Sequence, residues 1–177
     1  AGHHTGGAAS IIANPSFNLE KVYHALPFNS LNGHETTDDI LYMMNDPILF
    51  SKNRRGNSDI TAWGLQDMFA ASKETGIPTV PVEYGNIILQ ETIKVDGENR
   101  KLEIKVLSPP EPPFTGKYST GSNSIALQVD YGDRRILLTS DMDRTAQTAL
   151  LEAGGHLADV VQLPANGAKY AYEPEFI

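Results

Sequence analysis

Apolar and polar positions along the first half of the chain predict two helices and one strand. The stretch over residues 6–13 predicts a short helix after a glycine turn, and it ends at Asn14-Pro15 because the residue before a proline is disfavoured in helical conformation. Residues 19–25 form a short apolar run that predicts a buried strand. A longer helix is expected from the capping residues Ser58 or Asp59 to Gly76, where a left-handed terminator belongs.

The second half predicts mostly strands. The strand candidates are residues 86–89, 92–95, 102–107, 125–129, 136–139 and 158–163. Turn residues at 96–99 and 131–133 predict two hairpins, and a helix capped by Asp143 is expected to close at Gly154. Because helices and strands alternate, we expect one α/β or α+β domain over residues 1–177 with a largely buried sheet.

Composition narrows the function classes. The 177 residues carry 14 Lys+Arg against 22 Asp+Glu, a net charge of -8, which disfavours non-specific nucleic-acid binding through basic side chains. An enzyme acting on phosphodiesters remains compatible, because a bound divalent cation inverts the local field. Cysteine is absent, which excludes disulfides, thiolate zinc sites and cysteine nucleophiles. No apolar run approaches the roughly 20 residues of a membrane span, so no membrane segment is expected.

Two groups of residues have the chemistry of a metal site. Asp141 follows the apolar residues 136–140 and precedes a helix, a position at which ligands often meet a sheet. The alternative is that Asp141 or Asp143 caps that helix. His3 and His4 precede a glycine turn and can place imidazoles on a cation, or they are solvated histidines at a chain end.

Other polar patterns predict no site. No serine sits in a nucleophile elbow, and neither a Walker loop nor a dinucleotide-binding glycine pattern occurs. His34 lies in an acidic loop and is expected to be solvated, whereas His24 and His156 flank apolar stretches and are expected to be core or edge histidines. The arginine pairs 54–55 and 134–135 are interpreted as surface charge.

The order of segments from Val106 to Ile177 resembles the metallo-β-lactamase superfamily, in particular the hydrolase domain of ComEC-type competence proteins. The matching segments are Val106-Leu107-Ser108-Pro109-Pro110, Ser122-Asn123-Ser124, Ile136-Leu137-Leu138-Thr139-Ser140-Asp141 and Ala158-Asp159-Val160-Val161-Gln162-Leu163-Pro164. The third is similar to a family strand that ends in a metal-ligand aspartate, usually as Thr-Gly-Asp. His3-His4-Thr5-Gly6-Gly7 is similar to the tail of the His-x-His-x-Asp-His motif.

The resemblance implies an αββα sandwich lacking its first and last strands, so that residues 1–177 are part of a larger domain, with association with the missing parts as a further expectation. Family members use one or two ions to activate a water, which implies zinc or manganese here and a phosphodiester substrate, either nucleic acid or a nucleotide. By this resemblance His4 and Asp141 are metal ligands, Asp141 is also the catalytic carboxylate, and His3 substitutes for a lost aspartate. The expected substrate-binding residues are Asn123, Ser124, Asn166 and Lys169.

Departures from the family pattern leave the function open. Ala165-Asn166-Gly167-Ala168 stands where the family has His-His-Gly-Ser, and Ala1 falls where an upstream histidine belongs. One hypothesis is a metal-dependent hydrolase. A second is a degenerate family member that acts as a binding or structural module, and a third is an α/β domain without a site.

Overall fold

The computed structural model describes residues 7–25, 58–114, 122–155, 157–168 and 173–176. The chain divides into two compact units, of which the first comprises Ala1–His24 with Ser30–Pro81 and the second Ala25–Asn29 with Val82–Ile177. Each unit is described separately. Together they contain helices and sheets, which confirms the predicted mixed α and β class.

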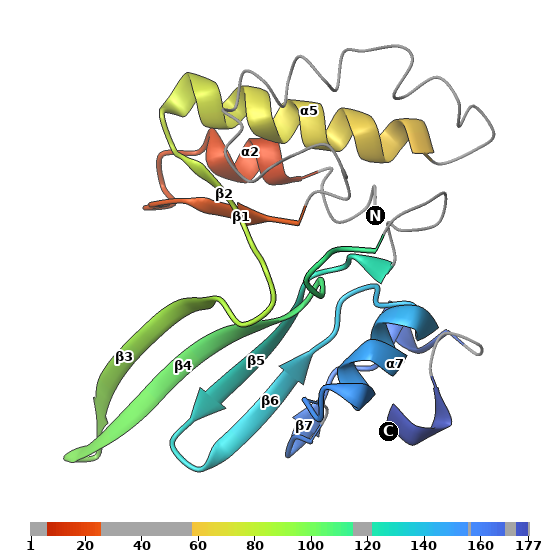
Figure 1. Cartoon of the computed structure of the whole chain (residues 1–177). Coiled ribbons are helices and arrows are strands. Elements are labelled where there is room, and N and C mark those ends of the chain that lie inside the picture. Colours follow the sequence, from red (N-terminus) through yellow and green to blue (C-terminus); the bar gives the residue numbers. More distant parts are fainter. Residues whose placement is uncertain (1–6, 26–57, 115–121, 156, 169–172, 177) are drawn as a thin grey trace. The chain divides into compact units, whose positions relative to one another are not determined.

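The first unit contains two helices and a two-stranded sheet (Figure 1). Its elements are α2 (Ala8–Ile12), β1 (Val22–His24), α5 (Ser58–Thr75) and β2 (Thr79–Pro81). β1 and β2 pair in parallel, with Val22 opposite Thr79. The helix α5 stops where Gly76 adopts a φ of 74°, which confirms the predicted terminator because glycine takes this conformation without a Cβ clash.

The second unit is a five-stranded sheet with one helix longer than two turns (Figure 1). Its elements are β3 (Ile87–Val95), β4 (Glu98–Ser108), β5 (Ala126–Tyr131), β6 (Arg134–Leu138), α7 (Arg144–Glu152), β7 (Val160–Val161) and the 3₁₀ turns η1 (Pro164–Gly167) and η2 (Pro174–Phe176). The strands lie in the order β3-β4-β5-β6-β7, and each neighbouring pair is antiparallel except β6 and β7, which are parallel.

Both predicted hairpins form, with tight turns. Val95 pairs with Glu98 across Asp96 and Gly97, whose φ values of 52° and 86° match the twist that two-residue hairpins require. Tyr131 pairs with Arg134 across the second turn. The predicted break between residues 89 and 92 is wrong, because Gln90 and Glu91 continue the pairing of β3 with β4. Polar residues are compatible with a strand whose side chains reach water.

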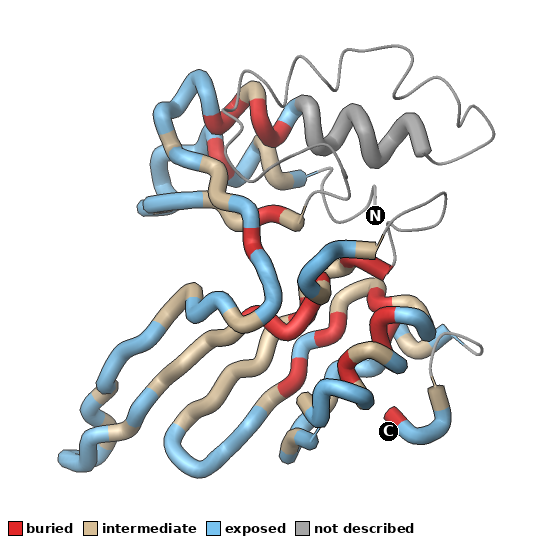
Figure 2. Tube along the Cα trace, viewed as in Figure 1, coloured by how far each residue is buried: buried red, intermediate tan, exposed pale blue. Residues whose placement is uncertain are grey.

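The core of this unit lies between one face of the sheet and α7 (Figure 2). The buried residues are Leu107, Ala126 and Leu137 from the strands, Met142, Ala146 and Leu150 from the turn and helix, and Phe176 from η2. This core orients α7 and fixes the segment between β6 and α7, because Met142 has no exposed surface.

The expectation of a largely buried sheet is wrong for its two edges. The predicted buried strand over residues 158–163 shortens to β7, where Val160 is 58% exposed because β7 is an edge strand. At the other edge, β3 is mostly exposed or half-buried. In the described residues no helix has the length and apolar character that crossing a bilayer would require.

Candidate functional site at one edge of the five-stranded sheet

Strand directions bring several predicted residues to one edge of the sheet. β4, β6 and β7 end at the edge where β5 begins, because β5 runs antiparallel to β4 and β6 while β7 runs parallel to β6. This edge therefore receives Asp141 after β6, Asn123 and Ser124 before β5, and Asn166 after β7. The carboxyl ends of neighbouring parallel strands are where open α/β sheets bind ligands.

A tight turn holds Asp141. The amide of Met142 donates to the carbonyl of Thr139 at 3.2 Å, which closes a turn with Ser140 and Asp141 at its centre. Thr139 and Met142 are both completely buried, whereas Asp141 is half-buried. The backbone at Asp141 is therefore fixed on both sides by residues packed in the interior.

Asp143, rather than Asp141, caps α7. One carboxylate oxygen of Asp143 accepts from the amide of Ala146 at 3.0 Å, and the other accepts from the hydroxyl of Ser122 at 2.6 Å. This confirms the predicted Asp143 cap and rejects the alternative in which Asp141 has that role.

The loop after β7 has an unusual backbone and is joined to the Asp141 turn. Ala165, Asn166 and Gly167 have consecutive left-handed φ values of 47°, 58° and 72°. The amide of Ala165 donates to the carbonyl of Ser140 at 3.0 Å, and Ser140 itself has a φ of 52°. Of the four described non-glycine residues with positive φ, three therefore lie in these two loops and one in a hairpin turn. Such strain is often found at functional sites.

Gln162 is a residue of this edge that sequence reasoning missed. Its side-chain oxygen accepts from the amides of Thr139 at 3.1 Å and Ser140 at 3.2 Å. Its carbonyl accepts from the hydroxyl of Thr139 at 2.7 Å, and its amide donates to the carbonyl of Leu137 at 2.8 Å. The available signal was a glutamine inside an otherwise apolar predicted strand.

Asn123 makes a structural contact at the same edge. Its side-chain oxygen accepts from the amide of Phe114 at 2.9 Å, and its side-chain nitrogen donates to the carbonyl of Phe114 at 2.8 Å. Asn123 is 3% exposed, so it anchors the end of the proline-rich loop from the interior. The substrate-binding role remains a prediction for Asn123, as it does for the half-buried Ser124 and the exposed Asn166.

The described residues supply too few donors for a metal on their own. Within the described ranges, no three histidine or carboxylate side chains gather closely enough to hold an ion. Three protein ligands are usual for a catalytic zinc, and Asp143 uses both carboxylate oxygens within the fold. The fit of zinc or manganese to Asp141 therefore depends on His3 and His4, which lie outside the described residues, as do Lys169, His34 and His156.

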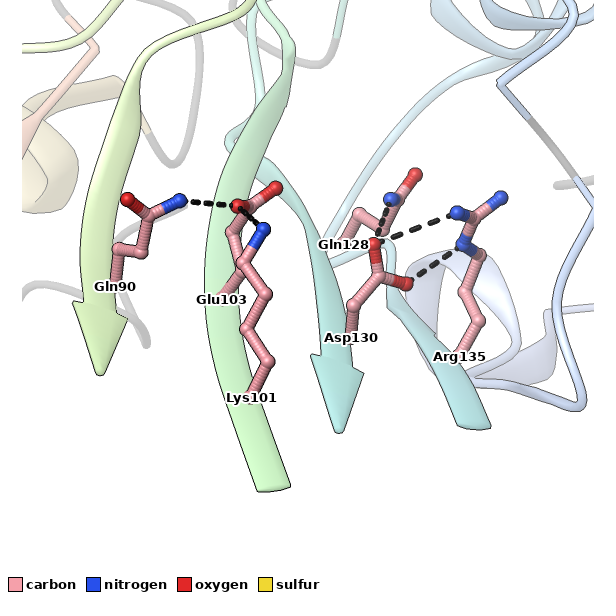
Figure 3. Close-up of polar contacts among 6 residues, drawn as sticks. All are labelled: Gln90, Lys101, Glu103, Gln128, Asp130 and Arg135. Atoms are coloured by element: carbon pink, nitrogen blue, oxygen red, sulfur yellow. Dashed lines mark hydrogen bonds and ion pairs between the residues drawn. The ribbon is translucent and has the colours of Figure 1, made fainter. Parts of the chain in front are cut away.

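A row of polar side chains crosses the sheet on the face that α7 partly covers (Figure 3). Glu103 and Asp130 lie directly opposite each other, a repulsive arrangement unless each is paired. Lys101 contacts Glu103 at 2.6 Å, and Arg135 contacts Asp130 at 2.7 Å.

These contacts keep both carboxylates charged. The pKa of Glu103 is lowered by hydrogen bonds from Lys101 and then Gln90, and the pKa of Asp130 is lowered chiefly by its hydrogen bond from Arg135. Both groups are therefore ionised at neutral pH and neither is a general acid. The exposed Arg134 and Arg135 carry surface charge as predicted, although both are ion-paired, Arg134 with Asp159 at 3.1 Å.

His24 is a core histidine of the first unit, as predicted. It is 5% exposed and its ring meets that of Phe69 edge-on, with centroids 5.2 Å apart. Neither ring nitrogen has a hydrogen-bond partner, and burial lowers the pKa of His24 to about 4.

No protein-family model, curated protein or solved structure matches this chain.

Proposed function

We propose that this chain is a metallo-β-lactamase-fold, metal-dependent hydrolase that uses Asp141 as a metal ligand and acts on a phosphodiester, either nucleic acid or a nucleotide. The observation that carries the proposal is the pair of strained loops at the carboxyl ends of β6 and β7, bonded to each other through Ala165 and Ser140. They hold a carboxylate at the sheet edge in a backbone conformation that the interior packing stabilises.

The second face of the sheet supports the finer assignment of an αββα sandwich. Leu137 faces α7, so its neighbour Ile136 faces the opposite side. Pairing across the strands places four more apolar residues in the row of Ile136, namely Leu89, Ile104, Val129 and Val160. An apolar row across all five strands needs a covering layer, and in a sandwich that layer is a second sheet.

In the proposed site, His3, His4 and Asp141 hold the ion. When bound, such an ion lowers the pKa of a coordinated water and stabilises negative charge on the phosphate. Ser124, Asn166 and Lys169 would orient the phosphate oxygens through hydrogen bonds and charge. Asn123 would contribute mainly by holding the Phe114 segment beside the site.

The test is metal content and hydrolysis of bis(p-nitrophenyl) phosphate by the wild-type chain and by Asp141→Ala. Asp133→Ala is the matched control, because Asp133 is an exposed aspartate in the turn between β5 and β6. Loss of a ligand should reduce activity by more than about 100-fold, whereas the control should keep it. A wild-type protein that binds neither zinc nor manganese and hydrolyses nothing contradicts the proposal.

A degenerate binding or structural module is the second candidate. It is favoured by Ala165 and Asn166, which stand where the resembling family has two histidines. Both residues are left-handed, a conformation that histidine tolerates better than most residues. A combined Ala165→His and Asn166→His variant that gains metal affinity indicates a site that has lost its ligands, and unchanged affinity indicates a pocket for another ligand.

A further inference from the structure

We infer that Gln162 is a positioning residue for Asp141, acting through the strained turn between β6 and α7. The inference rests on the proposed function, because it concerns the placement of the proposed metal ligand. It adds a residue from a different strand to the site.

The contacts of Gln162 converge on the two residues before Asp141. One side-chain oxygen accepts from two consecutive amides, those of Thr139 at 3.1 Å and Ser140 at 3.2 Å. Ser140 is left-handed, so this oxygen holds the turn at its strained residue. A hydrocarbon side chain of similar size would leave both amides without this acceptor.

The backbone of Gln162 couples the same turn to the edge strand. Its amide donates to Leu137 and its carbonyl accepts from Thr139, so residues on both sides of the end of β6 are bonded to this one residue. A shift of β7 along β6 would displace the side-chain and backbone partners together. The position of Asp141 therefore depends on the register of a strand that is only two residues long.

The side chain is exposed, so packing does not explain its place. A glutamine that merely faced water would have no preferred partner, whereas the oxygen of Gln162 is committed to two backbone donors. The role assigned to Gln162 is thus specific to its oxygen atom, and Gln162→Glu keeps an acceptor at that position whereas Gln162→Leu removes it.

The experiment compares wild type, Gln162→Leu and Gln162→Glu, with Gln90→Leu as the matched control on the opposite edge strand. NMR-detected hydrogen exchange of the Thr139 and Ser140 amides reports the turn, and paramagnetic broadening by Mn²⁺ near Asp141 reports the ligand position. Gln162→Leu should speed exchange of these amides by about tenfold or more and weaken apparent Mn²⁺ affinity by about tenfold. Gln162→Glu and Gln90→Leu should keep both within about threefold of wild type.

The outcomes separate this inference from the proposed function. If wild type shows no Mn²⁺ broadening, the proposed function fails and the positioning role fails with it. If wild type binds Mn²⁺ and Gln162→Leu binds it equally well, the inference alone is overturned. Should Gln162→Leu not fold, Gln162→Asn replaces it, because its shorter side chain withdraws the oxygen, and unchanged Mn²⁺ affinity in that variant overturns the inference.

Discussion

The amide of Ala165 donates to the carbonyl of Ser140 across 3.0 Å, and both residues have left-handed backbones despite carrying a Cβ atom. The bond joins the loop after β6 to the loop after β7 at the carboxyl edge of the sheet. Left-handed conformation is unfavourable for such residues, so the interior packing of Thr139 and Met142 must offset it. The result is a turn that is rigid at the cost of stability.

Replacing Ser140 by glycine should therefore stabilise the protein. Relief of the left-handed conformation is worth about 1–2 kcal/mol, and the greater freedom of glycine in the unfolded chain offsets about 0.5–1 kcal/mol of it. We expect Ser140→Gly to raise the free energy of unfolding by about 0.5–1 kcal/mol in urea titrations.

Asp96→Gly is the matched control, since Asp96 is also left-handed but lies in a hairpin turn where aspartate is well tolerated. Its effect should be close to zero. A destabilised Ser140→Gly variant would show that the Ser140 side chain contributes more than its backbone costs.

The sequence predicted those elements whose ends have local signals. Gly76 ends α5 and Asp143 caps α7, because the conformational freedom of glycine and a carboxylate beside free amides act over a few residues. The unbroken β3 and the short, exposed β7 were not predicted, because they depend on which strands lie beside them. Val160 is as apolar as a core residue, and only the absence of a further strand beside it in the described sheet exposes it.

The candidate site was predictable to a similar degree. The placement of Asp141 at the end of a strand follows from a local apolar run, and the structure places it there. The contact of Gln162 with the amide of Ser140 joins residues 22 positions apart and has no local signature. The left-handed backbone of Ser140 was likewise hidden, because serine does not mark that conformation as glycine does.

Removing the α7 cap should destabilise the second unit. Asp143→Ala loses the bond to the Ala146 amide and the bond from Ser122, and an N-cap is typically worth about 1–2 kcal/mol. Asp143→Asn should recover most of this stability, because the amide oxygen still accepts from Ala146. Urea unfolding followed by circular dichroism measures both variants, and equal stability of Asp143→Ala and wild type would contradict the capping role.

Asn123→Ala should cost about 2–3 kcal/mol of unfolding free energy, because the amide and carbonyl of Phe114 both lose their partner in a mostly buried setting. Asn86→Ala is the matched control, since Asn86 makes one exposed bond to the amide of Glu83 and should cost less than about 1 kcal/mol. If Asn123→Ala keeps wild-type stability but loses hydrolysis, the predicted substrate contact outweighs the structural one.

Protonation of His24 should destabilise the first unit as pH falls. The ordinary pKa of histidine is 6.5 and burial lowers that of His24 to about 4, so between these values the unfolded chain binds more protons than the folded one. Stability is therefore full above about pH 6.5 and is lost as pH falls toward 4, by about 3 kcal/mol for this group.

His24→Leu supplies the comparison, because leucine cannot bind a proton and leaves no unpaired ring nitrogens beside Phe69. Hydrogen-exchange protection factors of the β1 and β2 amides, measured near pH 7 and pH 4.5, should fall with acid in wild type by more than in His24→Leu. At pH 7 the variant should be at least as stable as wild type, since His24 is neutral there and its two nitrogens are buried without partners. An equal acid sensitivity of the two proteins would place the relevant protonation elsewhere in the chain.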